Sequence, residues 1–537
     1  MTGSFPIDYV SPLPPVRSGI SDYSADLLPH LAPLCDLRVI RVPGQEVSEA
    51  MEARWSPVAA TALGADGRLP VYHMGNNRYH EAVLELALAT PGVVALHDLV
   101  LHHLLIEATL GKEEVLGPYQ ERLRSDHGWV GEVAAQARQW GELGQSPMFE
   151  LAAHRTLLRR QRGVLVHSHW AVERLTEEQP GLAVRRVPMA MPLPERLDSA
   201  SGEALRERFG IPVAAPLLGS FGFQTPIKRT DVVVEALARP ELAGAHLLIA
   251  GELSPALDVE ARASELGIAD RVHIAGFLPF EDFEAAIAAC DLCVNLRYPT
   301  AGETSASLLR VLAVGRPAIV SDYAQFAELD ADSVLKVPLG ENEASDLAAA
   351  AGAVLGDPQR LAAMGEAARE HIRRDHDPDA AAASVIEACT ELAQLEPLGA
   401  GEVFEPSPST LTWRDLPGDM TVEGWDSEWP VGARRSLEIT LTNTGLGRWL
   451  ATRHDPGGVL VELQWRTEAW GETLSQEWIS MPTDLGPGES RRMRIELRRP
   501  PGGEALIVEP HVKGIAGFNK LGGPREILEL GAPCPQT

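Results

Sequence analysis

The chain has 537 residues and carries 47 Lys and Arg against 75 Asp and Glu, which gives a formal net charge of −28. A chain of this length is enough for about three or four domains, and its apolar and charged fractions are those of a globular protein. So acidic a surface repels phosphates. The charge therefore argues against a nucleic-acid partner and against electrostatic adhesion to an anionic membrane.

The sequence has none of the usual signals for export or membrane insertion. No run approaches the roughly 20 apolar residues of a membrane span, and the first residues lack the layout of a signal peptide. Cys290 and Cys293 form a C-x-x-C pair among small apolar residues, and no second pair completes a zinc site. Buried cysteines are thus favoured over redox or metal chemistry. We expect a cytoplasmic protein with no transmembrane segment.

The N-terminal third alternates apolar strands with helices, and a helix is expected to open at Gly19, after a Pro-rich turn. A long helical insert is expected over residues 99–162. Strands separated by helices predict a parallel sheet, so we predict a first Rossmann-like lobe over residues 1–187. The predicted strands are 37–42, 69–73, 92–96 and 163–167.

A second series of strands and helices follows a Pro-rich linker, residues 187–199. It predicts a second Rossmann-like lobe over residues 188–396, closed by an Ala-rich helix at 379–395. The predicted strands are 217–221, 246–250, 272–275, 292–296, 318–320 and 333–337.

The composition changes after residue 395, where a Pro/Gly/Glu linker is followed by strands with two-residue alternation. This pattern predicts an all-β sandwich over residues 408–537, which is also a possible dimer contact. Trp425, Trp429 and Trp449 lie in or beside its turns. Packing in the core is the default for such side chains, and stacking on sugars is the alternative.

Residues 296–322 combine a strand end, a polar turn, a helix and a further strand. Glu303, Thr304 and Ser305 stand where the helix should begin, because Thr and Ser supply N-cap oxygens. Gly315 ends the helix. Such a unit places unpaired amides and the positive end of a helix dipole at the carboxyl edge of a sheet, where α/β folds bind anions.

The order of motifs resembles the retaining glycosyltransferases of family four, which have the GT-B fold, over residues 5–390. PPVRSGISDYSADLLPHL resembles their glycine loop, at Gly19, and YHMGNNRYH and VVALHDLVLHH resemble a bacterial subgroup whose LHD motif contains His97. GSFGFQTPIKRTD resembles the family's Gly and Lys motif. The remaining positions that match are Gly222, Lys228, Gly251, Phe277 and Leu278, the last two in the segment that holds the nucleotide base.

The resemblance implies that a nucleotide diphosphate sugar binds to the second lobe and that its sugar moves, with retention, to a glycan or a lipid-linked or protein-linked saccharide. Lys228, the Thr304 and Ser305 amides and the Gly19 loop would hold the diphosphate, and His97 the sugar or the β-phosphate. Such preplaced donors can stabilise the leaving charge, so we expect no metal and no other cofactor. The acceptor would contact the first lobe, with specificity in the insert at 99–162.

Two positions depart from the family pattern. Phe223 stands where the family usually has an Arg, and Arg310 stands at the second of two spaced Glu positions, with Glu303 one residue from the first. That second Glu normally accepts hydrogen bonds from the ribose, which a guanidinium cannot do. Either Glu303 takes over the ribose contact, or Arg310 turns to the phosphates.

Other classes of protein stay open on the sequence. The two departures and the Trp-rich sandwich are compatible with a catalytically weak glycan-binding or scaffold protein of the same fold. A nucleotide-sugar epimerase would need an acid/base pair that the sequence does not reveal. The absence of P-loop and dinucleotide fingerprints disfavours an NTPase or dehydrogenase. Asp330 and Asp332 spell D-x-D, and a surface turn is the favoured interpretation.

Overall fold

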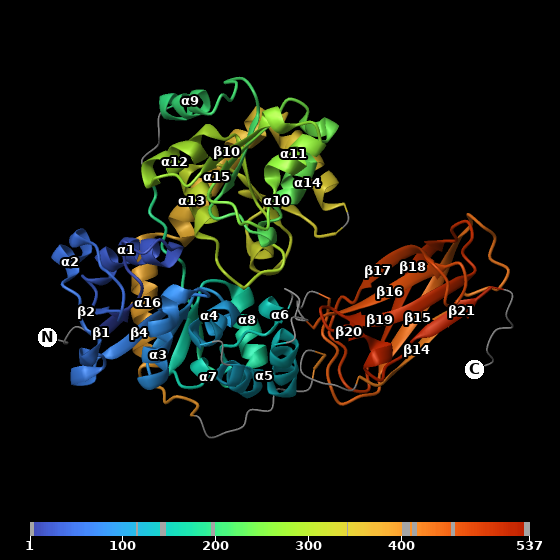
Figure 1. Ribbon diagram of the computed structural model, residues 1–537, viewed down its shortest axis with the longest axis horizontal. Coiled ribbons are helices and arrows are strands. Elements are labelled where there is room, and N and C mark those ends of the chain that lie inside the picture. Colours follow the sequence, from blue (N-terminus) through green and yellow to red (C-terminus); the bar gives the residue numbers. More distant parts are fainter. Residues whose placement is uncertain are drawn as a thin grey trace. The chain divides into compact units, whose positions relative to one another are not determined.

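A computed structural model describes residues 5–113, 116–139, 147–194, 199–340, 342–399, 409–410, 416–452 and 457–530. It shows two α/β lobes, each built on a parallel sheet, and a C-terminal region of antiparallel sheets (Figure 1). The predicted fold class is therefore confirmed. The predicted domain boundaries stay predictions.

The first lobe contains a parallel sheet of seven strands in its described residues, in the order β3-β2-β1-β4-β5-β6-β7. All residues of β4, β5 and β6 are buried, as expected for parallel strands that are covered on both faces. The strands are β1 (Pro6–Val10), β2 (Asp36–Arg41), β3 (Val58–Ala59), β4 (Leu69–Met74), β5 (Val93–Leu96), β6 (Gly163–Val166) and β7 (Val184–Arg186).

Helices connect these strands. Helix α1 begins after the N-cap Ser18, whose side chain accepts from the Ser21 amide. Between β5 and β6 the described residues are largely helical. The helices are α1 (Gly19–Leu31), α2 (Glu49–Trp55), α3 (Glu81–Ala89), α4 (His102–Glu113), α5 (Leu116–Gln139), α6 (Pro147–Glu150), α7 (Arg155–Leu158) and α8 (His169–Glu178), with short 3₁₀ turns η1 (Ala60–Ala62), η2 (Ala65–Gly67) and η3 (Arg78–His80).

The second lobe is built on a six-stranded parallel sheet in the order β10-β9-β8-β11-β12-β13. The central strands β8, β9, β11 and β12 are apolar and almost wholly buried, which explains why their bounds were close to the predicted ones. The strands are β8 (Leu217–Phe221), β9 (His246–Ala250), β10 (Val272–Gly276), β11 (Leu292–Asn295), β12 (Ala318–Ser321) and β13 (Val334–Val337).

The helices of this region begin with α9, after the linker. Helix α13 has Ser305 as its N-cap and ends at Gly315, whose φ of 90° is the left-handed conformation that favours glycine. The elements are α9 (Ser199–Arg208), η4 (Pro226–Lys228), α10 (Thr230–Leu237), η5 (Pro240–Leu242), α11 (Val259–Glu265), η6 (Ala269–Arg271), α12 (Phe280–Ala289), α13 (Ala306–Val314), η7 (Ala324–Glu328), α14 (Glu343–Leu355), α15 (Pro358–Asp375) and α16 (Pro378–Leu392).

The Ala-rich helix α16 lies against the first lobe, beside α1 (Figure 1). His30 Nδ1 at the end of α1 lies 2.6 Å from Asp379 Oδ1, and a Cβ added to Gly163 of β6 would meet the Leu392 side chain at 2.4 Å. The sequence placed this helix at the end of the second lobe. In the structure it covers the sheet of the first, so the chain crosses back between lobes.

The C-terminal region contains a three-stranded antiparallel sheet, β14-β15-β18, and a five-stranded sheet in which β17, β16, β19 and β20 are neighbours and β21 pairs with β19. The two sheets share one apolar core. The strands are β14 (Gly418–Glu423), β15 (Arg434–Asn443), β16 (Val459–Arg466), β17 (Thr473–Ser480), β18 (Ser490–Arg498), β19 (Ala505–Val512), β20 (Ala516–Gly517) and β21 (Glu526–Glu529), with η8 (Phe518–Lys520).

Tryptophans fill much of this core. Trp429 and Trp449 are fully buried, and Trp425 packs against Trp429 with ring centroids 5.7 Å apart. Trp429 and Trp449 therefore take the structural role that was the default expectation, and Trp425 packs against the core while its side chain stays partly exposed. Trp465, on β16, completes the cluster and is 1% exposed.

The C-x-x-C pair and the D-x-D sequence both have structural positions that the sequence analysis favoured. Cys290 and Cys293 are buried and unpaired, as their apolar surroundings indicated. Asp330 and Asp332 lie in an exposed turn before β13. Among the helices of the described residues, none is both long enough and apolar enough to cross a membrane.

Candidate active site

Lys228 and Gly222 meet at the carboxyl edge of the second lobe's sheet. Gly222 follows β8 with φ of 82°, and a Cβ added to it would lie 2.9 Å from Lys228 Nζ. Lys228 ends η4, and its ammonium donates to the Phe221 carbonyl at 2.6 Å. Burial lowers the pKa of Lys228 well below its ordinary value, and the Arg297 charge lowers it further. An anion bound here would restore the charged form.

The N-terminus of α13 points at the same place. The Ser305 hydroxyl accepts from the Leu308 amide at 3.3 Å and from Asn295 Nδ2 at 3.1 Å, so the first turn is fixed from inside the lobe. Ser307 lies 3.7 Å from the Cβ position of Gly222. Thr304 is partly exposed just before the cap. The helix dipole and the ammonium of Lys228 thus converge on one side of Gly222, which makes an anion site.

Arg297 is a buried cation that the sequence did not single out. It follows β11, is 6% exposed and donates through Nε to Glu303 Oε1 at 2.8 Å and through Nη1 to the Leu296 carbonyl at 3.0 Å. Among the described residues none accepts from Nη2. Its charge affects the pKa of Lys228, so both cations serve one small volume. The sequence signal that could have identified Arg297 is its position, as a cation directly after an apolar strand of the sheet.

Glu303 is held by its own turn. Its Oε1 accepts from Arg297, and its Oε2 accepts from the Thr300 hydroxyl at 2.9 Å and from the Ala301 amide at 3.0 Å. Both oxygens therefore already accept hydrogen bonds within this loop. A ribose contact from Glu303 would have to compete with them. The expected role of Glu303 stays a prediction, and the structure gives it a clear second task, the shaping of the turn.

Arg310 contacts acidic and aromatic side chains of the protein, and its expected contact with the phosphates stays a prediction. Its guanidinium lies 3.2 Å from Glu284 Oε1 and 3.3 Å from Asp26 Oδ2 of helix α1, and its Cζ lies 4.6 Å from the centroid of the Phe280 ring. The Asp26 contact joins the second lobe to the first. Arg310 therefore holds the lobes together at this edge in the structure, and its ion partners are carboxylates of the protein itself.

The segment expected to hold the base is split between surface and core. The Phe277 side chain is 57% exposed, with the Arg17 guanidinium 5.1 Å from its ring centroid, whereas Leu278 is 5% exposed and packs in the core. Gly251 approaches Gly222 so closely that a Cβ would meet its carbonyl oxygen at 2.1 Å. Phe223, at the position of the missing arginine, is 55% exposed.

The first lobe faces this site with Gly19 and Asp98. A Cβ added to Gly19 would meet no atom within 4 Å, so the space before the α1 N-terminus is open. Asp98 accepts from the Asn76 amide at 2.7 Å. Burial raises the pKa of Asp98 to about 7, and the charge of Glu303 raises it as well. Asp98 is therefore placed toward the other lobe, and in the described residues it does not pair with His97.

Three buried histidines occupy the carboxyl ends of β4, β5 and β6. His97 Nε2 lies 3.0 Å from His73 Nδ1, and His97 Nδ1 lies 3.2 Å from His167 Nε2. His167 Nδ1 lies 3.0 Å from the Val187 carbonyl oxygen. Both ring nitrogens of His97 are thus engaged inside the lobe. His97 was expected to reach the donor, and in this structure its ring would have to leave a neighbour to do so.

The histidine chain has one consistent proton arrangement. The Val187 oxygen only accepts, so His167 carries its proton on Nδ1 and accepts at Nε2 from His97. His97 then accepts at Nε2 from His73 Nδ1. Burial lowers the pKa of all three: to about 3 for His73, to about 4 for His167, and well below the ordinary value for His97. The neutral chain fixes the three strand ends relative to one another.

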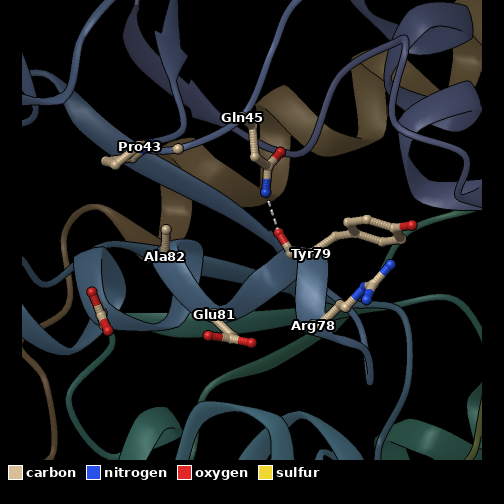
Figure 2. Close-up of a pocket in the computed structure, with 8 residues that line it drawn as sticks. Pro43, Gln45, Arg78, Tyr79, Glu81 and Ala82 are labelled. Atoms are coloured by element: carbon tan, nitrogen blue, oxygen red, sulfur yellow. Dashed lines mark hydrogen bonds between the residues drawn. The ribbon is translucent and has the colours of Figure 1, made fainter. Parts of the chain in front are cut away.

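A cavity of about 380 Å³ opens at the carboxyl edge of the first lobe, between the loop after β2 and helix α3. Figure 2 shows Arg78 and Tyr79 on one side, with the Tyr79 carbonyl accepting from Gln45. The cavity begins two residues after Asn76, whose amide holds Asp98. It is lined by Pro43, Gly44, Gln45, Arg78, Tyr79, Glu81, Ala82 and Glu85.

The sequence is similar in part to those of known glycosyltransferases. Residues 215–357, which contain Gly222, Lys228, Arg297 and α13, match the family model described as glycosyl transferases group 1. The chain is 28% identical over 227 residues to the 2-deoxystreptamine glucosyltransferase of Streptomyces kanamyceticus, covering 41% of this chain and 58% of that one. It is 30% identical over 236 residues to the D-inositol 3-phosphate glycosyltransferase of Thermobispora bispora, covering 42% and 52%.

Solved structures show the same fold at low identity. The sucrose-phosphate synthase of Thermosynechococcus elongatus superimposes with a TM-score of 0.51 and 17% identity, over 72% of this chain and 99% of that one. The Anabaena protein HepE, in complex with UDP and glucose, gives 0.52 and 16%, over 72% and 100%. Residues 215–357 thus match the group 1 glycosyltransferase model within two lobes of GT-B fold, and the chain spans little more than half the length of the curated relatives it matches.

Proposed function

We propose that this protein is a glycosyltransferase that moves a sugar from a nucleotide diphosphate sugar to a hydroxylated acceptor. The observation that carries the proposal is the convergence of Lys228, Arg297 and the α13 N-terminus beside Gly222, where a backbone without a side chain leaves room. The buried Arg297, the half-buried Lys228 and a helix end fit a group that carries two or more negative charges, as a diphosphate does. HepE, of the same fold, was solved with UDP and glucose, which supports this class of donor.

The chemistry follows from where charge develops. As the glycosidic bond breaks, negative charge grows on the leaving diphosphate, and donors that are already in place stabilise it without reorganisation. Lys228, Arg297 and the amides at Thr304 and Ser305 are such donors. We propose that they suffice without a divalent metal. We also propose retention by front-side attack, in which the leaving phosphate oxygen takes the proton of the acceptor hydroxyl.

The first lobe would close the other side of the reaction centre. The Val100 amide donates to the Ala301 carbonyl at 3.0 Å, which brings the loop after β5 against the loop of Glu303. Asp98 lies within this contact region, and its raised pKa lets its carboxyl donate as well as accept hydrogen bonds near neutral pH. We propose that Asp98 contacts the sugar or the acceptor, while the histidine chain behind it keeps the strand ends in position.

The acceptor would bind on the first lobe, and the cavity beside Arg78 and Tyr79 is the candidate place (Figure 2). The names of the two curated relatives specify small polyhydroxylated acceptors, 2-deoxystreptamine and D-inositol 3-phosphate. The volume of about 380 Å³ suits a ligand of that size. The described residues of the insert at 99–162, where the sequence placed specificity, are not among those that line this cavity.

A donor screen tests the proposal. The purified protein would be incubated with UDP-, GDP-, ADP- and TDP-sugars, with and without EDTA, and released nucleoside diphosphate measured. We expect release from at least one donor and no effect of EDTA; the anomeric configuration of the product, read by NMR, reports retention. A protein that releases nothing from any donor but binds a glycan array would be the scaffold of the same fold.

A further inference from the structure

The outer face of the five-stranded sheet in the C-terminal region carries two exposed tryptophans. Trp478 on β17 is 45% exposed, and Trp470, in the turn between β16 and β17, is 76% exposed. Along β16 the residues Val461, Leu463 and Trp465 enter the core, so Glu462 and Gln464 point to the opposite face. Two indoles exposed on one side of a sheet whose other side is packed are candidates for contact with a ligand, provided that the groups between them form one connected surface.

Polar side chains between the two indoles are held rigidly. Trp478, Glu462 and Glu509 form one cross-strand row over β17, β16 and β19. Glu462 accepts from both Gln464 and Gln476, and it is only 5% exposed. His511 Nε2 lies 2.7 Å from Glu462 Oε2, and its ring contacts Trp478 with centroids 5.2 Å apart.

The second carboxylate ties this row to the other indole. Glu509, also 5% exposed, accepts from the Asn519 amide at 3.1 Å and lies 3.4 Å from Arg525 Nε. The Cζ of Arg525 lies 5.5 Å from the Trp470 ring centroid. A Cβ added to Gly517 would lie 2.3 Å from Glu509 Oε1, so the β20 backbone passes close over this carboxylate. The contacts thus run without a break from Trp470 to Trp478.

The chemistry of this surface selects a class of ligand. The carboxylates of Glu462 and Glu509 already contact Arg525, His511 or amide donors. Little net charge is therefore left to attract a cation or a phosphate. A flat indole suits the apolar C–H face of a pyranose ring, and the amides and the guanidinium that the two buried carboxylates hold in place suit a rim of hydroxyls. Because the polar groups are fixed before binding, little entropy is lost on contact.

We infer that the outer face of this sheet, between Trp470 and Trp478, is a binding site for a neutral saccharide. The inference rests on residues of the C-terminal region alone and is independent of the donor site. Of the tryptophans that the sequence offered for stacking, Trp429 and Trp449 are in the core and Trp425 packs against it, and the most exposed rings are Trp470 and Trp478. If the proposed transferase activity holds, such a site would retain a glycan chain near the enzyme while its end is extended.

The test is a binding assay on the full chain. The wild type, Trp478→Ala and Trp470→Ala would be applied to an array of neutral oligosaccharides of glucose, galactose, mannose and N-acetylglucosamine, and the strongest ligand titrated by calorimetry. Leu446→Ala is the matched control, since Leu446 is 75% exposed in the same region but belongs to neither β16, β17 nor β19. We expect each Trp variant to weaken binding by about tenfold or more, as for an aromatic hot spot, and the control to bind like the wild type.

Donor turnover separates this inference from the proposed function. Release of nucleoside diphosphate should be unchanged in both Trp variants, whether or not saccharide binding is lost. Three results would overturn the inference: no neutral saccharide binds the wild type, both Trp variants bind as the wild type does, or charged saccharides bind while neutral ones do not. Light scattering that shows a wild-type dimer and a monomeric Trp478→Ala would instead assign the face to an interface between copies.

Discussion

Replacement of Arg297 by Met removes a buried guanidinium from beneath the proposed diphosphate site. Glu303, whose side chain is 18% exposed, would keep its hydrogen bonds from Thr300 and Ala301 but lose its ion partner. Removal of one partner of a buried pair costs about 3–5 kcal/mol, and the partial exposure of Glu303 places the expected loss near about 3 kcal/mol. At about 2–4 °C per kcal/mol, the unfolding transition of the lobes should fall by roughly 6–12 °C.

Donor turnover should fall as well, for a different reason. Loss of one preplaced charge-binding group costs about 2–4 kcal/mol of transition-state stabilisation, a factor of roughly 30 to 1,000 in rate. The double variant Arg297→Met/Glu303→Gln separates the two effects, because no unpaired carboxylate is left. It should regain most of the stability and none of the turnover. The assays are scanning fluorimetry and release of nucleoside diphosphate, with exposed Arg239→Met as the control expected to match the wild type.

Two results for the double variant would contradict this prediction. Turnover that recovers together with stability would show that Arg297 serves only the Glu303 turn. Stability that stays low in the double variant would show that the cost does not arise from the unpaired carboxylate.

Three further predictions concern other parts of the chain. Lys228→Ala should lose about 2–4 kcal/mol of transition-state stabilisation, mainly in kcat; near-normal kcat/KM would remove this lysine from the leaving-group site. A chain that ends at Glu396 should stay folded and release nucleoside diphosphate, with weaker transfer to large acceptors; aggregation would make the C-terminal region part of the catalytic unit. The buried, neutral histidines should lower the stability of the first lobe as pH falls below about 6.5, because the unfolded chain then binds more protons than the folded one. At pH 5 the free energy of unfolding should fall by about 2 kcal/mol for each such histidine. His73→Phe should flatten this dependence in urea unfolding while His169→Gln, at an exposed position, leaves it unchanged; equal slopes would contradict the assigned burial effect.

Most of the longer strands of both lobes could be predicted because they are apolar runs bounded by turns, although β1, inside the first sheet, was not among the predicted strands. Each strand predicted for the second lobe exists with bounds within one or two residues, and the helix predicted after Ser305 begins there. Short strands at the sheet edges, such as β3 and β7, escaped prediction because two or three residues show no periodicity. The lobe that α16 covers depends on contacts between residues more than 300 positions apart, and local patterns carry no such information.

The site was predictable in part. The turn around Gly222 and the cap at Ser305 carry local signals, and the structure brings Lys228 and the first turn of α13 to the same side of Gly222. The capture of Glu303 by Arg297 could not be predicted, because the direction of a side chain six residues away depends on how the loop folds. The histidine chain joins three strand ends far apart in the sequence, and only their common position after buried strands hinted at it.

The most direct test of the donor site is a calorimetric titration of UDP, GDP, ADP and TDP into the wild type and Lys228→Ala, with EDTA present. We predict that at least one nucleoside diphosphate binds the wild type without metal, and that Lys228→Ala weakens this binding by about tenfold or more. Because burial lowers the pKa of Lys228, binding at a pH above that lowered value should also take up a proton, visible as a heat that changes with the buffer. No binding by any of the four, or equal binding to the variant, would contradict the assignment of this edge of the sheet to the diphosphate.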